Sequence, residues 1–139
     1  MSLSQTMLTL FGNVAPPQHP RQLSIRFATS KRELEAAQQL RYRVFAQEMN
    51  AHCDGEREGF DIDRFDAYCQ HLLVVDEVSD RVVGCYRILT DARAVQAGGY
   101  YSQGEFDLTR VLGLPGRFME VGRTCVDPSY RSGAVIALL

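Results

Sequence analysis

The chain has 139 residues, is 45% hydrophobic and carries a formal net charge of −2, which is typical of one globular domain with its own core. This near-neutral balance argues against a nucleic-acid binder, because such proteins carry a basic patch or stripe. Lys31 is the only lysine among 15 Lys and Arg residues. The rest are arginines, which suit planar recognition of carboxylate or phosphate.

The first 21 residues contain neither the cationic start nor the small-residue cleavage site of a signal peptide. We interpret residues 1–21 as a flexible leader and residues 22–139 as the N-terminal part of a single domain. Nothing in the sequence approaches the roughly 20 apolar residues that cross a bilayer. These features predict a cytoplasmic protein.

A strand-like run and a helix open the domain, and a polar loop separates them from two further strand-like runs. Residues 22–30 alternate apolar and polar side chains, as a half-buried strand does. Ser30 and Glu33 match a capping box, which predicts a helix through Met49. After the acidic, glycine-containing loop at 51–70, two β-branched runs at 71–77 and 81–90 predict an antiparallel hairpin.

The second half of the chain alternates irregular and regular segments. Residues 91–117 are rich in glycine, so we expect an irregular stretch with a short helix near 108–112. Residues 118–127 predict a fourth strand, and the last six residues begin a helix. This order indicates an α/β (α+β) domain with helices flanking a mixed sheet.

The fourth strand contains the strongest candidates for catalysis. A regular strand would send Glu120 and Arg123 to opposite faces. Gly122 between them is a natural site for a β-bulge, which would turn both side chains toward one cleft. Glu120 is then a candidate general base, and Arg123 either holds its charge or binds an anionic substrate group. The alternative is a surface carboxylate beside a solvated arginine.

Other polar residues are open to two interpretations. Arg41 and Phe45 share a helix face, where a functional contact or a solvated arginine beside a core phenylalanine would fit. Asp63, Asp66 and Arg87 predict either a buried ion network or a solvated acidic turn.

The four cysteines are widely spaced and form no CxxC motif, which favours a reducing compartment. A metal-binding module of His52, Cys53, Cys69 and His71 is an alternative reading of the loop. Because that spacing matches no strong zinc signature, we predict no metal site. Cys125 is interpreted as a packed strand residue, since no histidine base is near it in sequence.

Five blocks occur in an order that resembles a known enzyme family. They are RYRVF (41–45), DIDRFD (61–66), VVGCYRILT (82–90), GGYYSQGEFDL (98–108) and the sequence from MEVGRTCVDPSYR (119–131) to the end. Together they resemble the GNAT-fold N-acyltransferases that make ornithine lipids. The resemblance implies a cytoplasmic enzyme, peripheral at the inner membrane, that moves a 3-hydroxyacyl group from acyl carrier protein to the α-amine of ornithine.

The same skeleton resembles the acyl-homoserine-lactone autoinducer synthases, which we rank second because they expect a tryptophan that this chain lacks. A non-catalytic domain that binds an acyl carrier is a third reading. The synthase motif pattern falls on eight residues of this chain. It implies catalytic roles for Glu120 and Arg123, and substrate or carrier-protein contacts for Arg41, Phe45, Asp63, Asp66, Arg87 and Phe106.

The resemblance also implies where the acyl donor would bind. The end of the fourth strand and the following loop would hold the donor's pantetheine phosphate through Cys125, Val126, Arg131, Ser132, Gly133 and Ala134. The single glycine departs from the diphosphate loop of coenzyme A users, which favours the acyl-phosphopantetheine of acyl carrier protein and no permanently bound cofactor. Because a GNAT domain continues beyond this point, we expect the 139 residues to be an inactive, poorly soluble or oligomeric fragment with an exposed strand edge.

Overall fold

A computed structural model describes residues 21–49, 57–131 and 133–139 of the chain. Four strands form one sheet in the order β1-β2-β3-β4. They are β1 (Leu23–Phe27), β2 (Gln70–Asp76), β3 (Arg81–Thr90) and β4 (Met119–Val126). The predicted strands and hairpin are confirmed, although all three pairings of the described strands are antiparallel, whereas we expected a mixed sheet.

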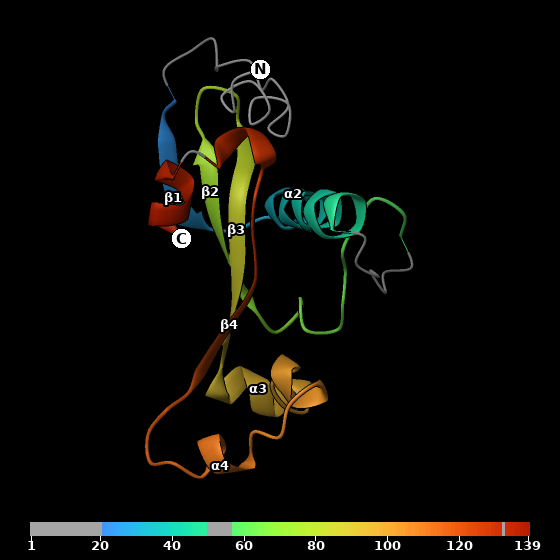
Figure 1. The fold of residues 1–139 in the computed structure, drawn as a ribbon, viewed down its shortest axis with the longest axis vertical. Coiled ribbons are helices and arrows are strands. Elements are labelled where there is room, and N and C mark those ends of the chain that lie inside the picture. Colours follow the sequence, from blue (N-terminus) through green and yellow to red (C-terminus); the bar gives the residue numbers. More distant parts are fainter. Residues whose placement is uncertain (1–20, 50–56, 132) are drawn as a thin grey trace, which may run out of the picture.

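Helices flank both faces of the sheet and one end of it (Figure 1). The long helix α2 (Lys31–Tyr42) continues into a π-helical turn, η1 (Arg43–Glu48). The remaining elements are short: α3 (Asp91–Ala97), η2 (Tyr101–Gly104), α4 (Thr109–Leu112), η3 (Pro128–Tyr130) and α5 (Ala134–Leu138). None of the helices in the described ranges is long and apolar enough to cross a membrane.

The start of α2 has the predicted capping box. The Ser30 side chain accepts a hydrogen bond from the Glu33 backbone N–H, and the Glu33 carboxylate accepts one from the Ser30 backbone N–H. The hydrogen bond that the Thr29 backbone N–H donates to the same carboxylate is the main reason that the pKa of Glu33 falls to about 2. Such a cap contributes about 1 kcal/mol to helix stability.

The face of the sheet toward α2 forms the first core. Ala37, Leu40 and Val44 of the helical segment are buried against strand residues Leu73, Val75, Cys85 and Cys125. These residues follow the helical and period-two spacing read from the sequence. Helix α2 is therefore fixed against β2, β3 and β4, and its last turn lies beside the strand that carries Glu120.

The opposite face of the sheet packs against α5. Val74, Val83, Val126, Tyr130 and Val135 form a second buried cluster there. A Cβ atom at Gly84 would lie 2.6 Å from Cγ1 of Val135. Glycine at position 84 is thus what allows α5 to approach β3 so closely.

The helix α3 was not predicted. It lies in a stretch expected to be irregular, but the glycines begin only at Gly98, which ends the helix in the left-handed conformation with φ of 79°. Ala94 and Ala97 are buried with Phe65 and Leu89 in a third cluster. The short helix expected near 108–112 is confirmed as α4.

Candidate functional site

The predicted β-bulge is present in β4, one residue beyond the expected glycine. Cys125 pairs with Cys85 and Gly122 pairs with Arg87, so Arg123 and Thr124 together face a single residue of β3. Arg123 has a left-handed φ of 52°, which is uncommon for a residue other than glycine. The extra residue reverses the alternation of the strand and brings Glu120, Arg123 and Cys125 to the face that looks toward α2.

Glu120 and Arg123 line the same pocket, as the bulge interpretation predicted. The pocket has a volume of about 170 Å³. Aromatic rings form part of its wall, with Phe65 and Tyr101 in edge-to-face contact at 5.5 Å and the Arg87 guanidinium 5.3 Å from the Tyr101 ring centre. The full lining comprises Phe65, Cys69, Arg87, Leu89, Tyr101, Ser102, Glu120, Val121, Gly122 and Arg123.

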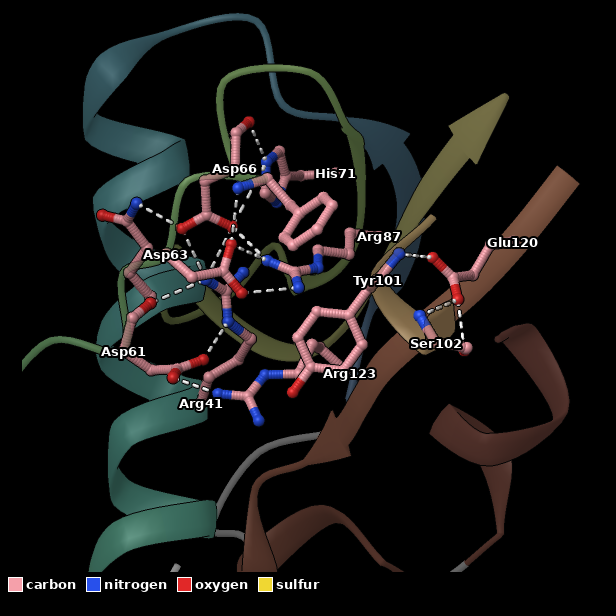
Figure 2. A network of polar contacts seen from close by, with 12 residues as sticks. Arg41, Asp61, Asp63, Asp66, His71, Arg87, Tyr101, Ser102, Glu120 and Arg123 are labelled. Atoms are coloured by element: carbon pink, nitrogen blue, oxygen red, sulfur yellow. Dashed lines mark hydrogen bonds and ion pairs between the residues drawn. The ribbon is translucent and has the colours of Figure 1, made fainter. Parts of the chain in front are cut away.

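The carboxylate of Glu120 is held by the start of η2. It accepts hydrogen bonds from the backbone N–H groups of Tyr101 and Ser102, each at 2.8 Å, and a short one from the Ser102 hydroxyl. Figure 2 shows these contacts on the β4 side of the Tyr101 ring. The position of Glu120 is therefore fixed, and it anchors the η2 turn to β4. Its role as a general base stays a prediction.

A buried ion network lies behind the pocket, which decides between the two sequence interpretations (Figure 2). Arg41 donates to Asp61 through Nε at 2.7 Å and to Asp66 through Nη2 at 2.8 Å. Arg87 donates to Asp63 at 2.7 Å and to Asp66 at 2.9 Å through Nη1. The side chains of Arg41 and Arg87 are only 1% and 4% exposed.

Electrostatics within the network favour the charged forms of Asp63 and Arg87. Burial alone would raise the pKa of Asp63, but the hydrogen bond and charge of Arg87 hold it below its ordinary value. Burial would likewise lower the pKa of Arg87, and Asp63 and Asp66 reverse that effect. Burial lowers the pKa of His71, so this residue is neutral at pH 7 while its Nε2 lies 3.0 Å from the Asp66 carbonyl oxygen.

The aspartate that connects the network to β4 was missed by the sequence interpretation. Asp61 accepts from Arg41 with one carboxylate oxygen and from Arg123 with the other. The network therefore contains three arginines and three aspartates, and their formal charges cancel. The DIDRFD block could have indicated it, because Asp61 and Asp63 are two residues apart and can point to the same side of an extended segment.

Burial limits the contacts expected for several residues. Arg41, Asp66 and Arg87 are enclosed in the ion network, so their side chains do not reach a carrier protein at the surface. Arg87 also lines the pocket, and its contact with substrate stays a prediction. Phe45 lies beneath the Arg123 guanidinium, whose Cζ is 4.6 Å from the ring centre. Phe106 is 64% exposed, so it is accessible to a partner.

The loop after β4 shows little that would identify a phosphate site. Arg131 is paired with Glu48 at 2.8 Å and with the Val126 carbonyl at 3.1 Å, so its charge is already compensated. Gly133 has a left-handed φ of 104°, and the helix that begins with Ala134 has only five residues. Ser132 lies outside the described residues. Phosphate binding therefore stays a prediction.

The thiol of Cys125 is a packed strand side chain, as expected. It is buried, with its Sγ 3.6 Å from Sγ of Cys85. The contact with Cys85 and burial both raise the pKa of the Cys125 thiol, which makes it a poor nucleophile. His52 and Cys53 lie outside the described residues, and within the described ranges no three metal-ligating side chains come together.

The comparison with protein families places this geometry in context. The family described as "Acetyltransferase (GNAT) domain" matches residues 40–139, which include the end of α2, the ion network and all of β4. The chain belongs to this GNAT family. The predicted fold class is confirmed by this match and by the sheet and flanking helices described above.

Several curated relatives of this GNAT chain share one name. It is 42% identical to the L-ornithine N(alpha)-acyltransferase of Agrobacterium fabrum, with 94% of this chain and 45% of the relative covered. It is 45% identical to that of Rhizobium meliloti and 42% identical to that of Brucella abortus, each over 84% of this chain and 43% or 45% of the relative. The chain thus spans less than half the length of these relatives.

A solved structure supports the same fold. The crystal structure of the AHL synthase LasI matches with a TM-score of 0.54 and 19% identity, over 84% of this chain and 58% of that chain. At this identity the similarity concerns the fold alone. The resemblance to the ornithine-lipid N-acyltransferases stated from the sequence is confirmed, and that to the autoinducer synthases is confirmed for the fold.

Proposed function

We propose that this GNAT domain serves the transfer of an acyl group to the α-amine of ornithine. The observation that carries the proposal is the shared pocket of Glu120 and Arg123 on the bulged strand. Its relatives are named L-ornithine N(alpha)-acyltransferases, which supports this acceptor. The cytoplasmic and inner-membrane location is part of the same proposal.

The charge of the site suits a cationic acceptor. The three arginines and three aspartates of the network cancel, so the carboxylate of Glu120 gives these residues a net charge of −1. Ornithine carries two ammonium groups and one carboxylate at neutral pH, for a net charge of +1. A diamino acid therefore matches the pocket better than an anionic acceptor does.

In the proposed reaction, Glu120 removes a proton from the ammonium group, because only the neutral amine attacks a carbonyl carbon. The amine nitrogen forms a bond to the thioester carbon, and the C–S bond then breaks. The proton taken from the ammonium group passes to solvent, so that Glu120, directly or through a water, can accept the second proton, which leaves nitrogen after the attack. Glu120 then delivers this proton to the departing pantetheine sulfur, which leaves as a thiol. Backbone N–H groups of the bulge from Gly122 to Cys125 are candidates to stabilise the oxyanion.

Replacing Glu120 tests this role. Glu120→Gln keeps a hydrogen-bond acceptor for η2 but removes the base, so acylation of ornithine by a full-length relative that carries this substitution should fall by roughly 10²-fold or more. Glu105→Gln is the matched control, because Glu105 is an exposed glutamate at the end of the η2 turn that Glu120 anchors. Turnover that survives Glu120→Gln unchanged would reassign Glu120 to anchoring η2 alone.

The donor is proposed to be an acyl-phosphopantetheine carried by acyl carrier protein. Competing acyl carrier protein and coenzyme A thioesters in the same assay should show preference for the carrier protein, and equal use of both would contradict it. Carrier-protein binding with no release of thiol would favour a non-catalytic domain. An acyl-homoserine lactone product would favour the synthase reading.

A further inference from the structure

We propose that Arg123 binds the carboxylate of the acceptor and so selects α-amino acids over amines that lack a carboxylate. Asp61 is the positioning residue that holds the Arg123 guanidinium for this task. The inference rests on the proposed function, because it assigns the second polar group of the acceptor within the same pocket.

Arg123 has fewer aspartate partners than the other two arginines of the network. Arg41 and Arg87 each bond to two aspartates. Arg123 bonds only to Asp61, through Nη2, and its buried Nε has no hydrogen-bond partner among the described residues. A guanidinium presents a fork of N–H groups that matches a carboxylate. Of these three arginines, Arg123 is the one whose fork is largely unused, and it lines the pocket.

The guanidinium is held in place before any ligand arrives. Asp61 is 2% exposed, and its own backbone fixes it: its N–H donates to the Gln38 carbonyl at 3.1 Å, and its C=O accepts from Arg41 at 2.6 Å. The Phe45 ring packs against the guanidinium, with Cζ 4.6 Å from the ring centre, and Arg123 sits at the left-handed position of the bulge. A preorganised donor loses little conformational freedom on binding and therefore gives more affinity.

Glu120 and Arg123 would bind the amine and the carboxylate of the same acceptor. Figure 2 shows them on either side of the Tyr101 ring, with Glu120 toward η2 and Arg123 toward Asp61. An α-amino acid has its amine and carboxylate on the same carbon atom. A carboxylate bound to Arg123 therefore keeps the amine close to the pocket wall that carries Glu120. An amine without a carboxylate leaves the Arg123 donors unmet, which a site built for hydrogen bonding discriminates against strongly.

The experiment uses a full-length relative that keeps these residues, and it compares ornithine with 1,4-diaminobutane, which has the same two amines without the carboxylate. The quantity measured is the ratio of kcat/KM for the two acceptors. The unchanged protein should prefer ornithine by about 100-fold or more. Arg123→Gln should reduce this ratio by about 10- to 100-fold, through a higher KM for ornithine and little change for the diamine.

Two further variants separate recognition from folding. Asp61→Asn should lower the ratio in the same direction by about 10-fold, because the guanidinium loses its charged anchor. Arg123→Lys keeps the charge without the fork and should retain part of the preference. Arg32→Gln is the matched control: Arg32 is also paired with a single aspartate, Asp80, but is 83% exposed, and the ratio should not change.

The outcomes distinguish this inference from the proposed function. Equal acylation of both amines by the unchanged protein would overturn the role of Arg123 and leave the acyltransferase proposal intact. If neither amine is acylated, the proposed function fails and the inference fails with it. If Arg123→Gln and Arg123→Lys lower activity equally with both acceptors, Arg123 supports the bulge and does not read the carboxylate.

Discussion

Replacing Arg41 with methionine tests whether the buried ion network stabilises the fold. Arg41 holds Asp61 and Asp66, and its side chain is 1% exposed. Breaking a buried pair by removing one partner costs about 3–5 kcal/mol, because the remaining charge stays buried. Asp61 retains Arg123 and Asp66 retains Arg87, so we expect a loss of about 3 kcal/mol, at the lower end of that range. Domains have total stabilities of about 5–15 kcal/mol, so the effect is large.

The assay is urea unfolding at pH 7, followed by far-UV circular dichroism. Arg32→Met is the control, since its exposed pair with Asp80 should contribute only about 0–1 kcal/mol. If Arg41→Met has no cooperative transition, the loss is at least the full stability of the unchanged chain. A loss below about 1 kcal/mol would refute the reasoning, because it would mean that the network is solvated like a surface pair.

Three other substitutions probe the fold. The pKa of Glu33 is about 2, against 4.5 in its ordinary state, so its contribution to stability is complete above pH 4.5 and is lost as the pH falls toward 2. Glu33→Gln should make the urea midpoint depend less on pH in that window and should cost about 1 kcal/mol at pH 7. An unchanged dependence of the midpoint on acid pH would count against this. His71 has a folded pKa below 6.5, so it contributes stability above pH 6.5 that is lost as the pH falls; His71→Gln should weaken this dependence, and steeper acid sensitivity would contradict burial of the neutral ring. Gly84→Ala should cost about 1–3 kcal/mol in thermal or urea unfolding through the clash with Val135, and Val135→Ala should restore part of that loss; no cost would show that α5 moves freely.

Most regular elements could be predicted because their signals are local. The Ser30 and Glu33 pair marks the start of α2, and the β-branched runs on either side of a short turn mark the β2–β3 hairpin. The α3 helix was missed because composition was averaged across residues 91–117, although Gly98 marks only its end. Residues 91–97 contain no glycine and fit a helix, but they were grouped with the glycine-containing residues that follow.

The site was predicted in part, and its remaining features depend on distant contacts. Gly122 indicated the bulge, which correctly placed Glu120 and Arg123 on one pocket. The contact between Glu120 and η2 joins residues 18 and 19 positions apart in the chain, and no local pattern reports it. The burial of Arg41 likewise follows from the path of the 61–66 segment behind α2, so a surface role read from the helix alone was wrong.

Because of the bulge in β4, the site depends on the exact number of residues between Glu120 and Cys125. Between Glu120 and Cys125 the strand has one residue more than β3 opposite it. Deleting Thr124 would restore regular alternation and leave Glu120 and Cys125 on one face. Arg123 would then lie opposite Tyr86 and turn to the other face of the sheet, away from the pocket. The turn at residues 113–117 is exposed, and length changes are tolerated much better in such a turn. The protein should therefore tolerate insertions and deletions before β4 and not between Glu120 and Cys125.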